Sequence, residues 1–387
     1  MTITRFSFPT TIQFGPGASK LAGPHLKGRG LKRPLVVTDK GLAALPLLAE
    51  FTASLAVAGL APAVYAGVFG NPTGSQVMNG AAAYRAHGAD CVVGLGGGAA
   101  LDVAKVVGLL ASHEGDVMEY VWDHPKVRTI GESLPYFVAL PTTAGTGSEV
   151  GRSSVISEED THVKRVIFSA QILARVVFAD PELTVGLPPG LTAATGMDAI
   201  AHCLETFMAP AVNPPADGIA LDGLQRGWAH IERATRDGHD LEARWQMMSA
   251  SMQGALAFQK GLGCVHSLSH SLGGVDPRLH HGTLNAMFLP AVIRFNAGAE
   301  SIRHEHRLQR IAQAIGLPGC DAQGNAVAIA IQEMNVALGL PEGLAAMGVT
   351  TALFERVIDG AMADHCHKTN PRIATREDYR AMLEASM

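Results

Sequence analysis

The hydrophobic positions in the first half of the chain fall in short runs rich in β-branched residues, and each run ends in a glycine or a small polar turn. Alanine-rich stretches with helical spacing follow most of these turns. This alternation is typical of βαβ units, in which helices connect the parallel strands of one sheet. The runs that predict strands are 35–38, 63–65, 91–95, 136–140 and 175–178.

The pattern changes after the Leu-Pro-Pro-Gly segment at 187–190. Strand-like runs disappear, and long windows with helical spacing replace them, for example at 191–208 and 241–258. A chain of 387 residues is also longer than one core usually organises. We therefore predict an α/β domain at 1–185 and an all-helical domain at 186–387, joined by the Pro/Gly-rich segment around 181–190.

Composition excludes several classes of protein. The chain is 47% hydrophobic and 17% charged, which favours a packed core over disorder. Its net charge of −5 and the absence of a Lys/Arg cluster argue against nucleic-acid binding. The first residues do not form a charged leader followed by an apolar core, and no apolar run reaches roughly 18 residues. Together with five scattered cysteines, these features predict a cytoplasmic protein without disulfide bonds or membrane segments.

A glycine-rich turn follows the predicted strand at 91–95. Gly96, Gly97 and Gly98 carry no side chains, so backbone N–H groups could approach a pyrophosphate. The helix that begins at Ala99 and includes Asp102 would add its positive dipole end. A glycine turn without a ligand is the alternative, because such turns are common between strands and helices.

A second polar turn, at 141–149, follows the strand at 136–140. Hydroxyl groups at Thr142, Thr143, Thr146 and Ser148 could donate hydrogen bonds to a phosphate or a ribose. They could instead only cap backbone donors, and the hydroxyls alone do not separate the two possibilities. No Gly-Lys-Ser/Thr follows at the spacing of a Walker loop, so ATP chemistry is not indicated.

Asp39 stands at the end of the predicted strand at 35–38. A carboxylate at this place in a nucleotide-binding fold accepts hydrogen bonds from the adenosine ribose hydroxyls and repels a 2′-phosphate. This position therefore favours NAD over NADP. The alternative is an Asp that only forms the turn before Gly41.

The second half of the chain concentrates potential metal ligands on predicted helices. An Asp–His pair and a His–His pair have i, i+4 spacing, which places both members on one helix face, and two adjacent histidines follow. These residues are Asp198 and His202, His266 and His270, and His280 and His281. Each could be an ordinary core histidine, but together a carboxylate and three imidazoles suit Fe(II), or alternatively Zn(II), and leave a position for a substrate oxygen.

These motifs resemble the iron-containing (group III) alcohol dehydrogenases, and the resemblance runs nearly from end to end. The glycine turn with its Asp-x-x-Lys helix spans 96–105, the Thr-rich turn spans 141–149, and the Asp/His elements follow in the same order as in the family. The resemblance implies a Rossmann-like nucleotide-binding domain followed by an all-α metal-binding domain, a dehydroquinate synthase-like architecture. It also implies an active site in the cleft between the domains, and a homodimer.

The resemblance also implies roles for individual residues. The metal ligands would be Asp198, His202, His266 and His281, and His270 would stand beside the nicotinamide as the catalytic histidine. Asn71, Thr73 and Lys164 would line the cofactor cleft.

The chain departs from the family pattern at two places. Ala99 replaces a serine, which removes one hydroxyl contact to the pyrophosphate. The spacing from His270 to the His-Gly element is one residue longer than in many members, so His280 is an alternative ligand. We prefer His281 because Gly282 and Asn285 set the register.

Within the family, the stretches 199–207, 213–219, 279–285 and 364–371 resemble bacterial 4-hydroxybutyrate dehydrogenases. This implies NAD-linked interconversion of 4-hydroxybutyrate and succinate semialdehyde. Lys260 or Lys368 could meet the substrate carboxylate, with Arg152 or Arg372 as weaker candidates. Alternative functions are a dehydrogenase for neutral alcohols or diols, a maleylacetate reductase, a relative of dehydroquinate synthase or glycerol dehydrogenase, and an NAD-sensing protein without turnover.

Overall fold

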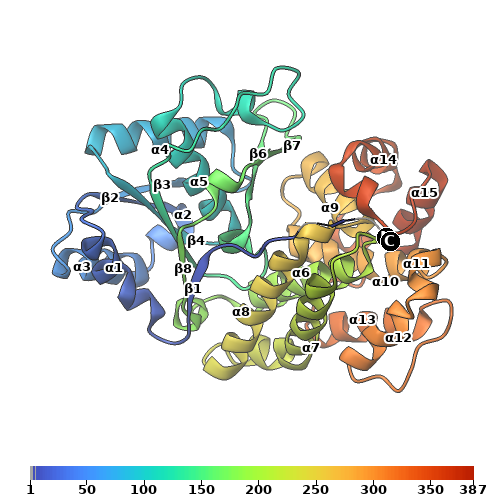
Figure 1. Ribbon diagram of the computed structural model, residues 1–387. Helices are drawn as coiled ribbons and strands as arrows, with labels where there is room; N and C mark the ends of the chain where they lie inside the picture. The colour runs from blue at the N-terminus through green and yellow to red at the C-terminus, as the bar shows by residue number, and fades with distance from the viewer. Residues whose placement is uncertain (1–2, 5) are drawn as a thin grey trace. The chain divides into compact units, whose positions relative to one another are not determined.

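The computed structural model describes residues 3–4 and 6–387 (Figure 1). The prediction that the protein is not exported was based on its first residues. Three of these, Met1, Thr2 and Arg5, lie outside the described residues. The chain divides into two compact units. The α/β unit comprises Pro9–Thr143 and Ser148–Gly186, and the helical unit comprises Leu187–Met387 with Ala144–Gly147 and the described residues up to Phe8.

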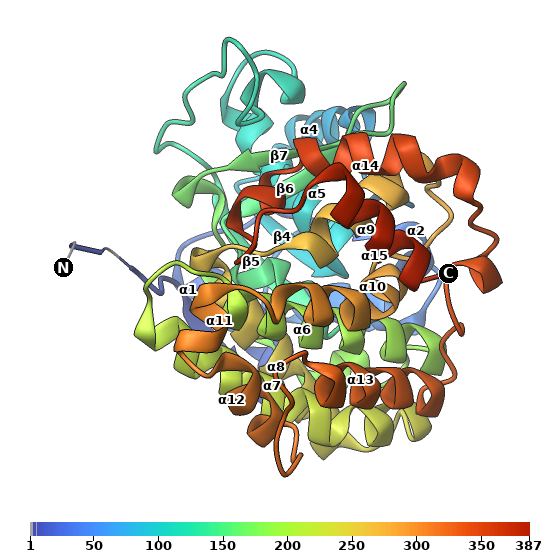
Figure 2. The ribbon, with the colours of Figure 1, turned by 90° about the vertical axis from the view of Figure 1, so that its right-hand side faces the viewer.

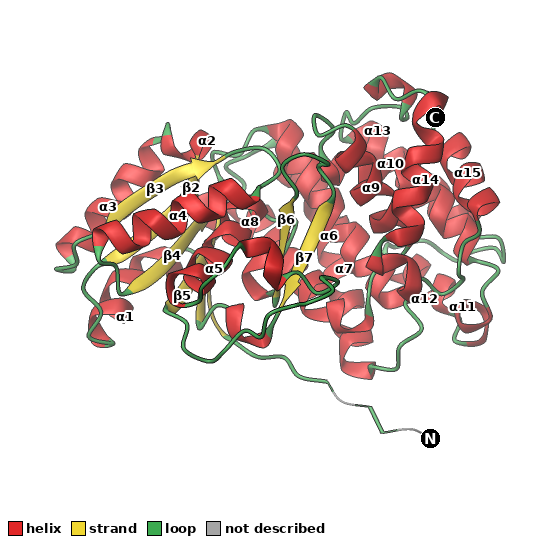
Figure 3. Cartoon of the chain, turned by 90° about the horizontal axis from the view of Figure 1, so that it is seen from above, coloured by secondary structure: helices red, strands yellow, loops and turns green. Residues whose placement is uncertain are grey.

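A six-stranded parallel sheet forms the centre of the α/β unit, with the strand order β1-β8-β5-β4-β2-β3 (Figure 3, yellow). The five predicted strands are present as β2, β3, β4, β5 and β8. The short edge strand β1 was not predicted, because its four residues carry little periodicity. The strands are β1 (Thr11–Phe14), β2 (Pro34–Asp39), β3 (Ala63–Val68), β4 (Cys91–Gly96), β5 (Tyr136–Pro141) and β8 (Val176–Ala179).

Helices cover both faces of this sheet, as a parallel sheet requires. On one face, Val93 and Leu95 of β4 pack with Leu26 of α1 and Phe51 of α3. On the other face, Gly94 approaches Leu101 of α5. The predicted Rossmann-like α/β architecture is confirmed. The helices of this unit are α1 (Ala22–Gly28), α2 (Lys40–Ala43), α3 (Pro46–Val57), α4 (Gly74–His87) and α5 (Gly98–Ser112).

An antiparallel hairpin of β6 (Ser153–Ser157) and β7 (Lys164–Phe168) was not predicted from the sequence. One of its attachments is the side chain of Asp102 on α5. One carboxylate oxygen of Asp102 accepts from the Val155 backbone N–H at 2.9 Å, and the other accepts from the Ser148 hydroxyl at 2.6 Å. A contact that depends on a side chain distant in sequence leaves no periodic signal within the hairpin itself.

The rest of the chain is helical, as predicted, and α9, α10, α14 and α15 pack together (Figure 2). Helix α6 is buried along most of its length. None of the helices in the described part of the chain is long and apolar enough to cross a membrane. The helices are α6 (Pro189–Met208), α7 (Pro214–Arg236), α8 (Leu241–Leu256), α9 (Cys264–Val275), α10 (His281–Asn296), α11 (Glu300–His304), α12 (Arg307–Ala314), α13 (Asn325–Ala337), α14 (Phe354–Ala363) and α15 (Arg376–Ala385).

Four residues of the Thr-rich turn, Ala144–Gly147, belong with the helical unit, although the predicted boundary assigns them to the first domain. Glycine makes this possible. A Cβ on Gly145 would come within 2.8 Å of the Thr195 carbonyl oxygen, and one on Gly147 within 2.2 Å of Ala255 Cβ. Any larger residue at these positions would force the turn away from α6 and α8.

A buried ion pair supports the α/β unit and yields a stability prediction. Lys105 is fully buried and donates to the Ser148 hydroxyl at 2.8 Å and to the Ser153 carbonyl at 2.6 Å, with Asp102 at 3.3 Å. Removing one partner of a buried pair leaves an uncompensated charge, so we expect Asp102→Ala to lower the free energy of unfolding by about 3 kcal/mol. The measurement is urea denaturation.

The matched control is the exposed pair Arg128–Glu119, for which Glu119→Ala should change the unfolding free energy far less than Asp102→Ala does. An Asp102→Ala effect no larger than that of the control would contradict the structural role of the buried pair.

Candidate metal and cofactor site

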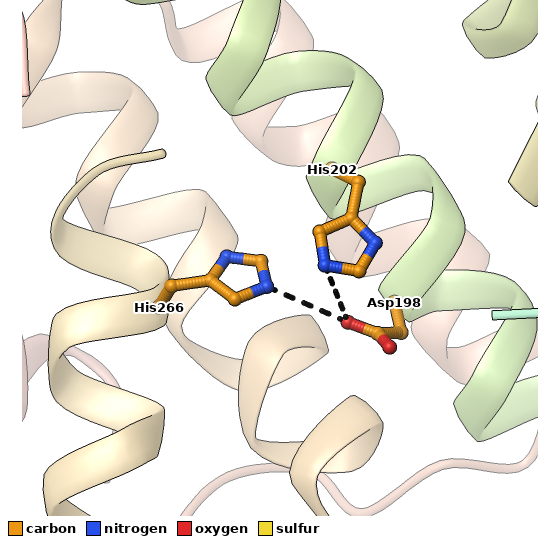
Figure 4. Close-up of side chains that lie close together, drawn as sticks. All are labelled: Asp198, His202 and His266. Atoms are coloured by element: carbon orange, nitrogen blue, oxygen red, sulfur yellow. Dashed lines mark ion pairs between the residues drawn. The ribbon is translucent and has the colours of Figure 1, made fainter. Parts of the chain in front are cut away.

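Asp198 and His202 lie one helical turn apart on the buried helix α6. Their i, i+4 spacing turns both side chains to the same face, and His202 Nε2 lies 3.5 Å from Asp198 Oδ1 (Figure 4). His266, on α9, reaches the same oxygen with its Nε2 at 3.6 Å. The three side chains are 5% exposed or less, and their ligand atoms all lie within 4.8 Å of one another.

His281 brings a third imidazole to the same carboxylate oxygen, with its Nε2 3.7 Å from Asp198 Oδ1. A Cβ on the next residue, Gly282, would come within 2.1 Å of the Ala194 carbonyl oxygen. Only glycine therefore lets the start of α10 approach α6 closely enough to place His281 here. The alternative ligand His280 is exposed and precedes the first turn of α10.

Each of these histidines has a hydrogen-bond partner at Nδ1, the ring nitrogen that does not face Asp198. His266 Nδ1 donates to Glu205 Oε2 at 2.5 Å, and His202 Nδ1 donates to the Gly145 carbonyl at 3.2 Å. His281 Nδ1 lies 3.2 Å from the Ser269 hydroxyl. A carboxylate or carbonyl oxygen only accepts, so Nδ1 of His266 and of His202 carries a proton, and Nε2 is the nitrogen that the neutral ring would offer to a metal.

Burial and neighbouring charges shift the pKa values of this group in different directions. Burial lowers the pKa of His202 to about 4. Burial would also lower the pKa of His266, but the adjacent carboxylates of Glu205 and Asp198 together outweigh it and raise that pKa to about 9. Burial would raise the pKa of Asp198, yet His202 and His281 hold it well below its ordinary value. The centre therefore offers an ionised carboxylate and a neutral His202.

The donor chemistry of this group fits a divalent cation. Ligands about 2.1 Å from a tetrahedral metal are themselves about 3.4 Å apart, close to the observed 3.5–3.7 Å separations from Asp198 Oδ1. Asn285 is the hydrogen-bond donor at this point, with its Nδ2 2.7 Å from Asp198 Oδ1 and 3.3 Å from His266 Nε2. Two amide hydrogens do not satisfy the converging lone pairs, whereas a cation would.

His270 lies beside this group with a carboxylate of its own. Its ring stacks on His281 at a centroid distance of 5.3 Å and an interplanar angle of 13°. Its Nδ1 donates to Asp364 Oδ2 at 3.0 Å. Burial would raise the pKa of Asp364, but the charge and hydrogen bond of His270 hold it far below its ordinary value. A buried carboxylate therefore orients His270, which we expect to be the catalytic histidine.

The α/β unit brings together the predicted pyrophosphate turn and Asp39. A Cβ on Gly96 would lie 3.2 Å from Asp39 Oδ2, and one on Gly97 would lie 3.3 Å from the Thr143 side chain. The Thr142 backbone N–H donates to the Gly96 carbonyl at 3.0 Å. Asp39 also accepts from the Leu42 N–H at 2.8 Å as the cap of α2, so the turn-forming role considered from the sequence is present as well.

The remaining cofactor candidates form two further groups. The Thr73 backbone bridges to Ser157, and Ser157 pairs with Lys164 across the β6–β7 hairpin, so the turn that contains Asn71 adjoins the strand of Lys164. Ser148 and Asp102 hydrogen bond to each other at 2.6 Å. Gly98 and Ala99 lie at the first turn of α5, and Thr146 lies in the segment that belongs with the helical unit.

Comparison with known proteins identifies the family. Residues 9–181 match the iron-containing alcohol dehydrogenase family, and residues 192–387 match the C-terminal part of the Fe-containing alcohol dehydrogenase family. The chain belongs to the iron-containing alcohol dehydrogenases. It is an NAD-linked alcohol oxidoreductase that uses iron and acts on small alcohols or aldehydes.

Similar proteins in this family are named for different substrates. The chain is 53% identical to a 4-hydroxybutyrate dehydrogenase of Cupriavidus necator over 98% of both chains. It is 34% identical to an NAD-dependent methanol dehydrogenase of Bacillus methanolicus over the full length of both. A crystal structure of 1,3-propanediol oxidoreductase superposes with a TM-score of 0.93 at 34% identity, covering 99% of this chain and all of the other.

The structure of this alcohol dehydrogenase also shows residues that the sequence analysis left without a role. Glu205 follows Asp198 and His202 at i+7 and i+3, so helical periodicity places all three on one face and could have revealed it. Asp364 and the Gly145 carbonyl oxygen gave no such signal, because each acts on a histidine far away in sequence.

Glu205 yields a prediction on metal affinity. Its carboxylate orients His266, and losing a hydrogen-bond partner behind a metal ligand typically lowers metal affinity by 10- to 100-fold. We expect Glu205→Ala to lower Fe(II) or Zn(II) affinity by about this factor. Competition with a chelating dye under anaerobic conditions measures the change.

Glu205→Gln is the conservative comparison, because the amide oxygen can still accept from His266 Nδ1; it should recover part of the affinity. The exposed Glu242 on α8, substituted by Ala, provides a control. If Glu205→Ala bound the metal as tightly as the Glu242→Ala control does, Glu205 would have no role in supporting the metal.

Proposed function

We propose that this alcohol dehydrogenase interconverts 4-hydroxybutyrate and succinate semialdehyde with NAD. The 53% identity to a 4-hydroxybutyrate dehydrogenase, over 98% of both chains, carries this choice of substrate. Other relatives are named for methanol and 1,3-propanediol, so a neutral alcohol or diol is the second candidate. A maleylacetate reductase is disfavoured by the intact Asp198 with its three converging imidazoles.

In this proposal Asp198, His202, His266 and His281 hold the iron. Bound iron supplies a Lewis acid, which lowers the pKa of an alcohol hydroxyl. The three Nδ1 contacts support this assignment, because they fix ring orientations and direct the Nε2 lone pairs inward. The partial exposure of His281, at 25%, leaves an open side for a substrate, whereas the other three side chains are buried.

His270 is proposed to carry the proton that the alcohol releases. Asp364 accepts from its Nδ1 at 3.0 Å, which leaves Nε2 to take or give a proton. The same carboxylate stabilises the protonated ring while the proton resides there, as in other carboxylate–histidine pairs.

NAD, which accepts the hydride, is proposed to bind at the turns of the α/β unit. Gly96, Gly97 and Gly98 with the first turn of α5 would hold the pyrophosphate, and Asp39 would accept from the adenosine ribose. The other residues proposed to contact the cofactor are Asn71, Thr73, Ala99, Asp102, Thr142, Thr143, Thr146, Ser148 and Lys164.

We further propose a cytoplasmic homodimer. The five cysteines are all free thiols, four of them buried, which suits a reducing compartment. The dimer is an expectation from the family resemblance, and analytical ultracentrifugation measures it directly.

The substrate proposal predicts a preference among alcohols. Reconstituted with Fe(II), the enzyme should oxidise 4-hydroxybutyrate with a higher kcat/KM than ethanol, 1,3-propanediol or butane-1,4-diol, as measured by NADH formation. Asp198→Ala should lose both bound metal and turnover. Turnover by metal-free protein would contradict the metal assignment, whereas a preference for a neutral alcohol would contradict only the substrate.

Asp39 predicts the choice of dinucleotide. Replacing Asp39 by Ser removes the charge that would repel a 2′-phosphate but retains a cap for α2. We expect the ratio of kcat/KM for NAD to that for NADP to fall by about tenfold or more, since one charge-assisted hydrogen bond contributes about 1.5–3 kcal/mol. An unchanged ratio would place the ribose elsewhere.

A further inference from the structure

We propose that Lys368 binds the carboxylate of the substrate and sets the preference for a hydroxy acid over a neutral alcohol. This inference rests on the proposed function, which requires a cation for the 4-hydroxybutyrate carboxylate.

The other candidate cations have partners of their own. Lys260 is buried and donates to Asp217 and to the Phe207 carbonyl. Arg372 pairs with Asp378 at 3.3 Å. These contacts give both residues structural roles, so the earlier expectation for Lys260 does not hold.

Arg152 belongs to the α/β unit, and its guanidinium carbon lies 4.8 Å from the centroid of the Phe168 ring. Lys368, by contrast, is exposed, and its ammonium group has no ion-pair or hydrogen-bond partner among the described residues.

Lys368 lies on the 3-10 helix η9 (His365–Thr369), directly after Asp364. A 3-10 helix has three residues per turn, so His365 and Lys368 share one face. The other side chains of η9 face inward: Cys366 is buried, His367 contacts the Tyr379 hydroxyl at 2.9 Å, and Thr369 donates to the Leu262 carbonyl at 2.7 Å. His365 and Lys368 thus form the exposed face of η9.

This exposed face begins beside the metal group, that is, beside Asp198, His202, His266 and His281. The His365 ring stacks on His270 at a centroid distance of 6.0 Å and 24°, and His270 in turn stacks on His281 at 5.3 Å. Three nearly parallel imidazoles therefore lead from Asp198 toward η9. Lys368 follows one turn after His365, about 6 Å further along the helix axis.

The substrate has a length that suits this spacing. In an extended 4-hydroxybutyrate, the hydroxyl oxygen and the carboxylate are about 5–6 Å apart by ordinary bond lengths. A hydroxyl at the metal ligands thus places the carboxylate about as far out as the His270 ring, and the side chain of Lys368, which spans about 6 Å, would reach back along the stacked rings to meet it. Asp364 would not repel it strongly, because its oxygens are engaged by His270 and by the Cys366 backbone N–H at 2.8 Å.

The test compares 4-hydroxybutyrate with butane-1,4-diol, which has the same chain length but no charge. We expect Lys368→Met to raise KM for 4-hydroxybutyrate by about tenfold or more and to leave kcat within about twofold, because a charge-assisted hydrogen bond is lost in ground and transition states alike. Kinetics with butane-1,4-diol should not change, which also shows that the variant folds. Lys368→Arg should retain most of the preference.

Arg356→Met is the matched control, because Arg356 is an exposed cation on the neighbouring helix α14. Inhibition by butyrate, which has the carboxylate without the hydroxyl, should weaken in Lys368→Met and not in the control.

If the wild type prefers 4-hydroxybutyrate and Lys368→Met leaves both that preference and butyrate inhibition intact, this inference fails while the proposed function stands. A wild type without any preference for the hydroxy acid over the diol would overturn the proposed function and the carboxylate site together.

Discussion

The helical unit is organised around one buried carboxylate oxygen. Asp198 Oδ1 lies within 3.7 Å of three imidazole nitrogens that come from α6, α9 and α10. A buried ionised group is strongly unfavourable unless partners compensate it, so these helices must approach one another closely at this point. The close approach explains the glycine at position 282, where a Cβ would meet the backbone of α6.

The same constraint accounts for the polar groups behind the histidines. An imidazole can present a lone pair inward only if its other nitrogen carries the proton and has an acceptor. Glu205 and the Gly145 carbonyl oxygen supply those acceptors for His266 and His202. Gly145 lies two positions after Thr143, which packs against the glycine turn of the α/β unit. One polar turn in the sequence therefore serves both the cofactor turn and a histidine of the metal group.

Helix α9 shows how the surroundings separate two chemically identical residues. His266 and His270 lie one turn apart on the same helix. His266 has Glu205 behind it and faces Asp198, whereas His270 has Asp364 as its acceptor and stacks on His281. The surroundings of each ring, rather than the histidine or its spacing, thus distinguish His266, the proposed metal ligand, from His270, the proposed proton carrier.

The sequence alone determined the fold class, five of the six strands of the main sheet, and the glycine-rich, Thr-rich and Asp/His motifs from which the family was inferred. This was possible because strand runs, glycine turns and i, i+4 pairs are local patterns, and a helix or strand expresses them wherever it packs. The tertiary structure decided that His281 rather than His280 faces Asp198, that Lys260 is paired with Asp217, and that Glu205 and Asp364 stand behind the histidines. It also decided the β6–β7 hairpin and the place of Ala144–Gly147. These features depend on contacts between residues distant in sequence, and only the packed chain brings such residues together.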